Sequence, residues 1–117
     1  DNRIKATVLS SSVSSLKQDP TLGIVHTWLT ILPGIARITE TSGILALIAP
    51  RPLMIVYTDD PINFIEDAQI QINEITKVYN VLEENEKFNL VFLPDASHEF
   101  PLKYHEQAYQ FLDKYLK

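Results

Sequence analysis

Two polar segments of the chain contain the residue types that acid–base catalysis requires. Asp60 lies shortly after the apolar run 53–57, and His98 lies shortly after the apolar run 90–93. A carboxylate that accepts the Nδ1–H of an imidazole fixes the tautomer of the ring and stabilises its protonated form, so that Nε2 can act as a base. If the two runs are neighbouring parallel strands, the segments that follow them meet at one edge of the sheet. The sequence therefore predicts that Asp60 and His98 form an acid–base pair.

Both residues also have a plainer interpretation. Aspartate and proline are common in turns, so Asp60, which precedes Pro61, is equally typical of a turn or of a helix cap. A single histidine in a polar loop, such as His98, is usually just exposed to solvent. The position of both residues directly after predicted strands favours the functional interpretation, because ligands of open parallel sheets bind at the carboxyl ends of the strands.

These loops need strands before them and helices after them. The apolar runs 4–9, 53–57 and 90–93 are predicted strands, and the last two are continuously apolar, as is typical of strands buried on both faces of a parallel sheet. Helices are predicted over 66–84 and 102–115, where apolar residues recur every three or four positions. The alternation of strands and helices predicts an α/β fold, a three-layer arrangement of about three parallel strands with flanking helices.

Each long helix is expected to bury one apolar stripe. A shorter helix over 43–48, capped by Ser42 and closed by two prolines, is predicted before the second strand. The stripe of the first long helix consists of Ile65, Ala68, Ile72, Ile75, Tyr79 and Leu82, and that of the second of Tyr104, Ala108, Phe111, Leu112 and Tyr115.

The composition excludes several classes of function. The chain of 117 residues is long enough for a single domain, 1–117. Fifteen acidic and ten basic residues give a net charge of −5, which disfavours nucleic acid as a partner, and no apolar stretch is long enough to span a membrane. There is no cysteine, which excludes disulfides, thiolate zinc sites and a cysteine nucleophile. We expect no metal and no cofactor, and the cellular location is unknown.

The segments that contain the two candidate residues resemble the C-terminal portion of an α/β-hydrolase. The resemblance rests on 49–56, 59–62 and 97–100, and it is nearest to the acetylxylan-esterase-like and dienelactone-hydrolase-like members. In that family the catalytic residues follow the order Ser, Asp, His along the chain. The resemblance implies that Asp60 is the acid and His98 the base of a serine hydrolase acting on a small ester.

A nucleophile elbow is missing from the chain. The G-x-S-x-G elbow needs small residues around the serine because its turn is tight, and no glycine of this sequence flanks a serine in that pattern. The resemblance therefore implies that the nucleophile half of the domain lies upstream of Asp1 and that the chain alone is inactive. Ser12, which has serines two positions before and after it, is the internal alternative. Pro20 follows it too soon for the sturdy helix that should follow an elbow.

The first strand motivates a hypothesis from a different class. A three-stranded sheet has two open edges, and an open edge can pair with another strand. The alternative function is a non-catalytic α/β interaction module that docks through the edge beside Ile4–Leu9. In the hydrolase hypothesis, the same edge pairs with the missing N-terminal half or with a second copy of the chain. Three further residues are assigned by position: His26 and Trp28 to ordinary packing or a pocket wall, and His105 to a solvated helix face.

Overall fold

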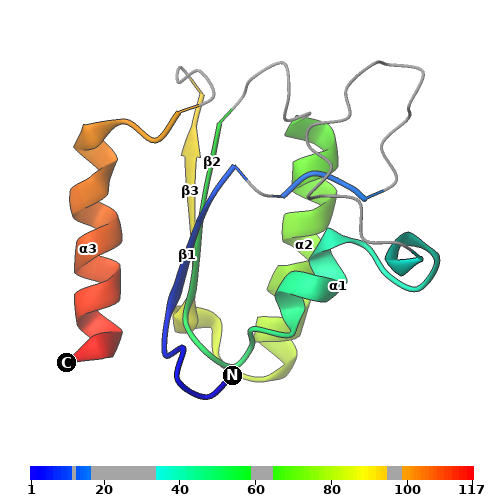
Figure 1. The fold of residues 1–117 in the computed structure, drawn as a ribbon, viewed down its shortest axis with the longest axis horizontal. Helices are drawn as coiled ribbons and strands as arrows, with labels where there is room; N and C mark the ends of the chain where they lie inside the picture. The colour runs from blue at the N-terminus through cyan, green and yellow to red at the C-terminus, as the bar shows by residue number, and fades with distance from the viewer. Residues whose placement is uncertain (12, 17–33, 59–64, 95–98) are drawn as a thin grey trace.

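The computed structural model describes residues 1–11, 13–16, 34–58, 65–94 and 99–117. Within them, three strands and three α-helices form three layers (Figure 1). None of the described helices is long and apolar enough to cross a membrane.

The sheet consists of three parallel strands. β1 (Thr7–Ser10), β2 (Leu53–Thr58) and β3 (Phe88–Leu93) lie in the order β1-β2-β3, so that β2 is central. The α/β fold predicted from the alternation of apolar runs and helical patterns is confirmed. All six residues of β2 are buried, as its continuously apolar sequence predicts.

Helices cover both faces of the sheet (Figure 1). α1 (Thr41–Ala46) and α2 (Ile65–Val81) lie on one side, and α3 (Leu102–Leu116) lies on the other. Two short 3₁₀ helices, η3 (Ile35–Arg37) and η4 (Asn85–Lys87), precede α1 and β3.

The core has two halves because successive side chains of a strand point to opposite faces. On one face of β2, Leu53, Ile55 and Tyr57 pack against the buried stripe of α2. On the other face, Met54 and Val56 pack against α3. The α2 stripe contains Ala68, Ile72, Ile75 and Tyr79, and the α3 side contains Ala108 and Phe111 with Tyr104, Leu112 and Tyr115 partly buried.

The structure corrects three details of the predicted elements. α1 begins at Thr41, after the N-cap residue Glu40, so Ser42 is not the cap. Ser42 is buried, and its backbone N–H donates to Oε1 of the buried Gln71 at 3.0 Å, which joins α1 to α2. α2 ends at Val81, so Leu82 lies outside the helix and is exposed.

The third correction concerns β3. Its sequence is as apolar as that of β2, but β3 pairs with β2 and with no other described strand. Leu90 and Phe92 are therefore 37% and 38% exposed, although a strand buried on both faces was expected. Periodicity could not reveal this, because central and edge strands can have the same apolar sequence.

Candidate active site

The carboxyl ends of the three strands form one rim of the sheet. In the parallel register, Thr58 at the end of β2 is the partner of Leu93 at the end of β3. Neighbouring strands lie about 4.8 Å apart, so the chain leaves β2 and β3 at adjacent points of the rim. The segments that contain Asp60 and His98 begin directly after these two residues in the sequence. Asp60 and His98 themselves lie outside the described residues, as do Ser12, His26 and Trp28.

The end of β1 adds a second hydroxyl to this rim. The backbone N–H of Ser11 donates to the carbonyl oxygen of Val56 at 2.8 Å, which continues the pairing of β1 with β2. The Ser11 hydroxyl lies 3.4 Å from the Thr58 hydroxyl. Ser11 has φ 53°, in the left-handed region that non-glycine residues rarely adopt. Sequence reasoning did not identify this pair, because its two members are far apart in the sequence and neither belongs to a motif.

Two carboxylates tie the segment after β1 to the helices. Oε2 of Glu40 accepts the Ser15 hydroxyl at 2.9 Å and the Leu16 N–H at 3.0 Å. A carboxylate oxygen of Asp67, in the first turn of α2, accepts the Ser15 N–H. Both carboxylates therefore bind donors of the 13–16 segment, and we assign them a structural role.

Two aromatic rings anchor the segment that follows His98. Phe100 packs against the cluster on the α3 side of the sheet. His105, near the start of α3, places its ring 4.7 Å from that of Phe100, and its Nε2 donates to the Phe100 carbonyl oxygen at 2.9 Å. The prediction that His105 lies on a solvated face is wrong: the ring is half-buried, because it packs on Phe100.

Tyr79 lies at the opposite end of the sheet, where the strands begin. The hydroxyl of Tyr79 donates to the carbonyl oxygen of Arg51, directly before β2, at 2.6 Å. Burial raises the pKa of Tyr79 to about 12, and the Arg51 guanidinium acts in the opposite direction. The Arg51 side chain donates to the carbonyl oxygens of Asp1, Ile4 and Ile48. We assign these contacts, at the end of the sheet where the strands begin, a structural role.

Within the described residues, no three histidine or acidic side chains come together in a group that could hold an ion.

Comparison with known proteins gives one structural likeness. No protein-family model and no curated protein matches the chain. The solved structure named methylesterase BT1017 has a similar fold, with a TM-score of 0.54 and 19% sequence identity. The likeness covers 62% of this chain and 16% of that protein's chain, so this chain spans only a small part of that protein's length. At this identity the likeness concerns the fold alone.

Proposed function

We propose that this chain supplies the acid and the base of a serine hydrolase that cleaves carboxylic esters. In this proposal, Asp60 orients His98, and the nucleophilic serine and its oxyanion hole belong to a part of the protein outside this chain. The substrate is a small ester of the acetyl-ester type. The proposal includes that the chain alone is inactive, since a base without a nucleophile has nothing to activate.

The register at the sheet rim is the observation that carries the proposal. Thr58 and Leu93 are partners in the parallel pairing of β2 with β3. Asp60 follows Thr58 by two positions, and His98 precedes the anchored Phe100 by two. Along the sequence, both candidate residues are therefore within two positions of a residue that the structure describes. The likeness of the fold to that of a protein named a methylesterase gives further support.

The proposed roles follow from acid–base chemistry. Nε2 of His98 takes the proton of the serine hydroxyl as the serine oxygen attacks the ester carbonyl. The carboxylate of Asp60 accepts the Nδ1–H and stabilises the imidazolium that forms. The imidazolium then gives its proton to the departing alcohol, which leaves an acyl-serine. Water attacks this acyl-serine while His98 takes its proton, and His98 then returns the proton to the serine oxygen as the acid is released.

A labelling experiment tests this proposal. A fluorophosphonate probe should label the full-length product of the reading frame that encodes this chain, and should not label the 117-residue chain alone. In the full-length product, Asp60→Asn and His98→Ala should each lower the hydrolysis of a short acyl ester by about 10³–10⁴-fold. Ester turnover by the 117-residue chain that Ser12→Ala or Ser11→Ala abolishes would show instead that the nucleophile lies inside this chain.

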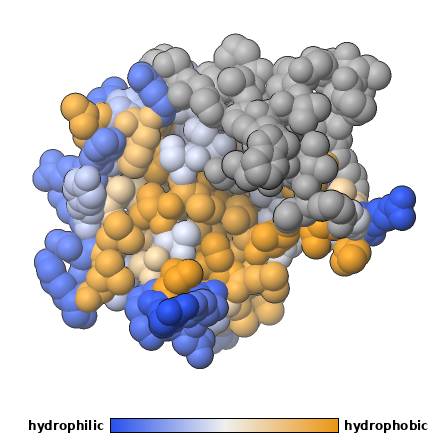
Figure 2. All heavy atoms as spheres, viewed as in Figure 1, coloured by the Kyte–Doolittle hydropathy of each residue, from blue (hydrophilic) through white to orange (hydrophobic). Residues whose placement is uncertain are grey.

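The surface around β1 favours a second candidate function. In the view of Figure 2, apolar surface gathers over the region where β1 runs in front of the other strands in Figure 1. β1 pairs with β2 and with no other described strand, and Ile4 and Leu47 are 52% and 77% exposed. An edge of this kind can recruit another strand. The alternative is a non-catalytic module that docks through β1. In the hydrolase proposal, the partner at this edge is the N-terminal half of the domain or a second copy.

A further inference from the structure

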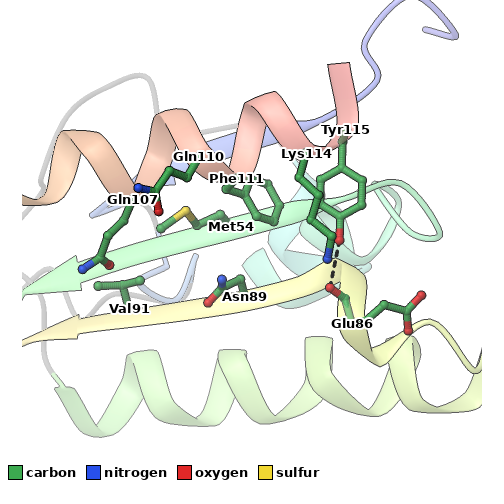
Figure 3. Close-up of a pocket in the computed structure, with 9 residues that line it drawn as sticks. All are labelled: Met54, Glu86, Asn89, Val91, Gln107, Gln110, Phe111, Lys114 and Tyr115. Atoms are coloured by element: carbon green, nitrogen blue, oxygen red, sulfur yellow. Dashed lines mark hydrogen bonds between the residues drawn. The ribbon is translucent and has the colours of Figure 1, made fainter. Parts of the chain in front are cut away.

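A pocket lies between β3 and α3, away from the rim of the candidate active site. It has a volume of about 330 Å³ and lies beside the edge of β3 that faces no other described strand (Figure 3). Met54, Val91 and Phe111 provide its apolar lining. Its polar lining consists of Glu86, Asn89, Gln107, Gln110, Lys114 and Tyr115.

Most polar side chains of the pocket are exposed to solvent, so a ligand can reach them. Within the described part of the chain, the side chains of Asn89 and Gln107 make no hydrogen bond, and Lys114 makes no ion pair. The Lys114 ammonium points into the pocket, whereas the Glu86 carboxylate points away from it (Figure 3). Tyr115 closes one end by donating from its hydroxyl to the Glu86 carbonyl oxygen at 2.9 Å. The pocket therefore presents a positive charge and free amides, although the whole chain has a net charge of −5.

The adjacent edge of β3 presents backbone groups. A parallel strand with one neighbour leaves the N–H and C=O of every second residue directed toward its open side. On the face opposite the pocket, Leu90 and Phe92 of β3 are more than one-third exposed. Within the described residues, this edge thus has unpaired backbone, a polar pocket with Lys114 on one face and an apolar strip on the other.

We propose that this edge binds an extended peptide as an additional strand. Its acidic side chains would enter the pocket toward Lys114 and the amides of Asn89 and Gln107, and its apolar side chains would cover Leu90 and Phe92. Successive side chains of a strand point to opposite faces, so the partner alternates acidic and apolar residues. This site is separate from the candidate active site and does not depend on the hydrolase proposal.

Charge favours a peptide of this kind over a second copy of the chain. If two copies paired antiparallel through their β3 edges, the faces covered by α3 would lie on the same side of the joined sheet. Each would then offer Asn89 and Val91 to the pocket of the other, and neither residue has a carboxylate for Lys114. An acidic side chain on the added strand would supply the missing charge.

The test uses a capped hexapeptide in which valine alternates with glutamate. Titrated into the isotope-labelled 117-residue chain, it should shift the backbone amide signals of β3 and of the pocket-facing positions of α3. A dissociation constant below about 1 mM is expected, and it should rise with salt. Lys114→Glu should weaken binding at least about tenfold and should favour the same peptide with lysine in place of glutamate.

The matched control is Lys103→Glu. Lys103 and Lys114 both lie on α3 with the ammonium over the ring of the next tyrosine, but only Lys114 lines the pocket. Lys103→Glu changes the net charge equally and should leave the affinity unchanged. A peptide that is N-methylated at the residues whose N–H groups face β3 should not bind, because it cannot donate hydrogen bonds to the strand.

Three results would overturn the proposal. One is no binding of the valine–glutamate peptide at about 1 mM. Another is equal weakening by Lys114→Glu and Lys103→Glu, which would mean that only net charge matters. The third is a dimer in light scattering whose formation shifts the β3 amide signals without any peptide, which would assign the edge to a second copy.

Discussion

The hydroxyl of Tyr79 joins α2 to the segment that leads into β2, the central strand. Tyr79 is almost fully buried, its ring stacks on that of Phe88 at 5.3 Å, and its hydroxyl binds the Arg51 carbonyl oxygen. A buried hydroxyl must keep a partner, because an unsatisfied polar group in the core is costly. Burial disfavours the charged form of the hydroxyl, and this raises the pKa of Tyr79.

Tyr79→Phe tests this contact. We expect a loss of about 1 kcal/mol in the free energy of unfolding at pH 7, the usual value for one hydrogen bond, measured by urea titration. The stability should also depend on pH. The pKa of Tyr79 is raised from 10.0 to about 12 in the folded chain, so the contribution is complete below pH 10. Between pH 10 and about 12 the unfolded chain loses this proton and the folded chain keeps it, so stability falls as pH rises.

The comparison that isolates Tyr79 is with Tyr109→Phe, at an exposed position of α3. Above pH 10, the wild type and Tyr109→Phe should lose stability more steeply than Tyr79→Phe. Parallel curves for all three proteins would contradict the assignment.

Among the helices, the end of α2 shows how the chain turns back into the sheet. The N–H of Glu83 donates to the Asn80 carbonyl oxygen at 3.1 Å, and that of Glu84 donates to the Tyr79 carbonyl oxygen at 3.0 Å. This is the Schellman pattern, with Glu83 at the left-handed position usually taken by glycine. Glu83 has φ 57°, so its β-carbon is strained there. The turn depends on these backbone bonds and gains nothing from its residue type.

Glu83→Gly should therefore stabilise the protein. Relief of the left-handed strain contributes roughly 1–2 kcal/mol, and the greater chain entropy of unfolded glycine offsets roughly half of it. A net gain of about 0.5–1 kcal/mol in the free energy of unfolding is expected from chemical denaturation. Glu83→Ala removes the same charge and keeps the β-carbon. A gain of the same size for alanine would attribute the effect to charge instead of backbone conformation.

For the molecule as a whole, the two outer strands present different surfaces. Ile4, three residues before β1, and Leu47, directly after α1, are exposed apolar residues, whereas β3 lies beside a polar pocket with Lys114. Buried apolar area drives association, whereas polar and charged groups mainly set specificity. We therefore expect β1 to form the permanent contact of this chain and β3 a selective one.

Replacement of Ile4 and Leu47 together by lysine tests the β1 edge. The 117-residue chain should associate in a concentration-dependent manner in sedimentation experiments, and the double variant should weaken that association at least about tenfold. Ile38→Lys with Ile70→Lys is the matched control, because both residues are exposed and lie on other elements. If this pair weakens association equally, or if the chain stays monomeric at high concentration, the β1 contact is not supported.

The alternation of strands and helices was readable in the sequence because it depends on local periodicity. The continuously apolar 53–57 predicted a buried strand, and residues 53–58 form the buried β2. The order of residues along the chain likewise set Asp60 and His98 directly after two predicted strands. Their pairing stays a prediction, because both lie outside the described residues.

Tertiary structure alone decided what each apolar residue meets. Leu90 and Phe92 are as apolar as residues of β2 but are partly exposed, since only packing determines which strand lies at an edge. Ser11 meets Thr58, and His105 meets Phe100, through contacts that no local pattern encodes. A local pattern indicates whether a segment forms a helix or a strand. Which residues distant in sequence come into contact depends on how all the elements pack together.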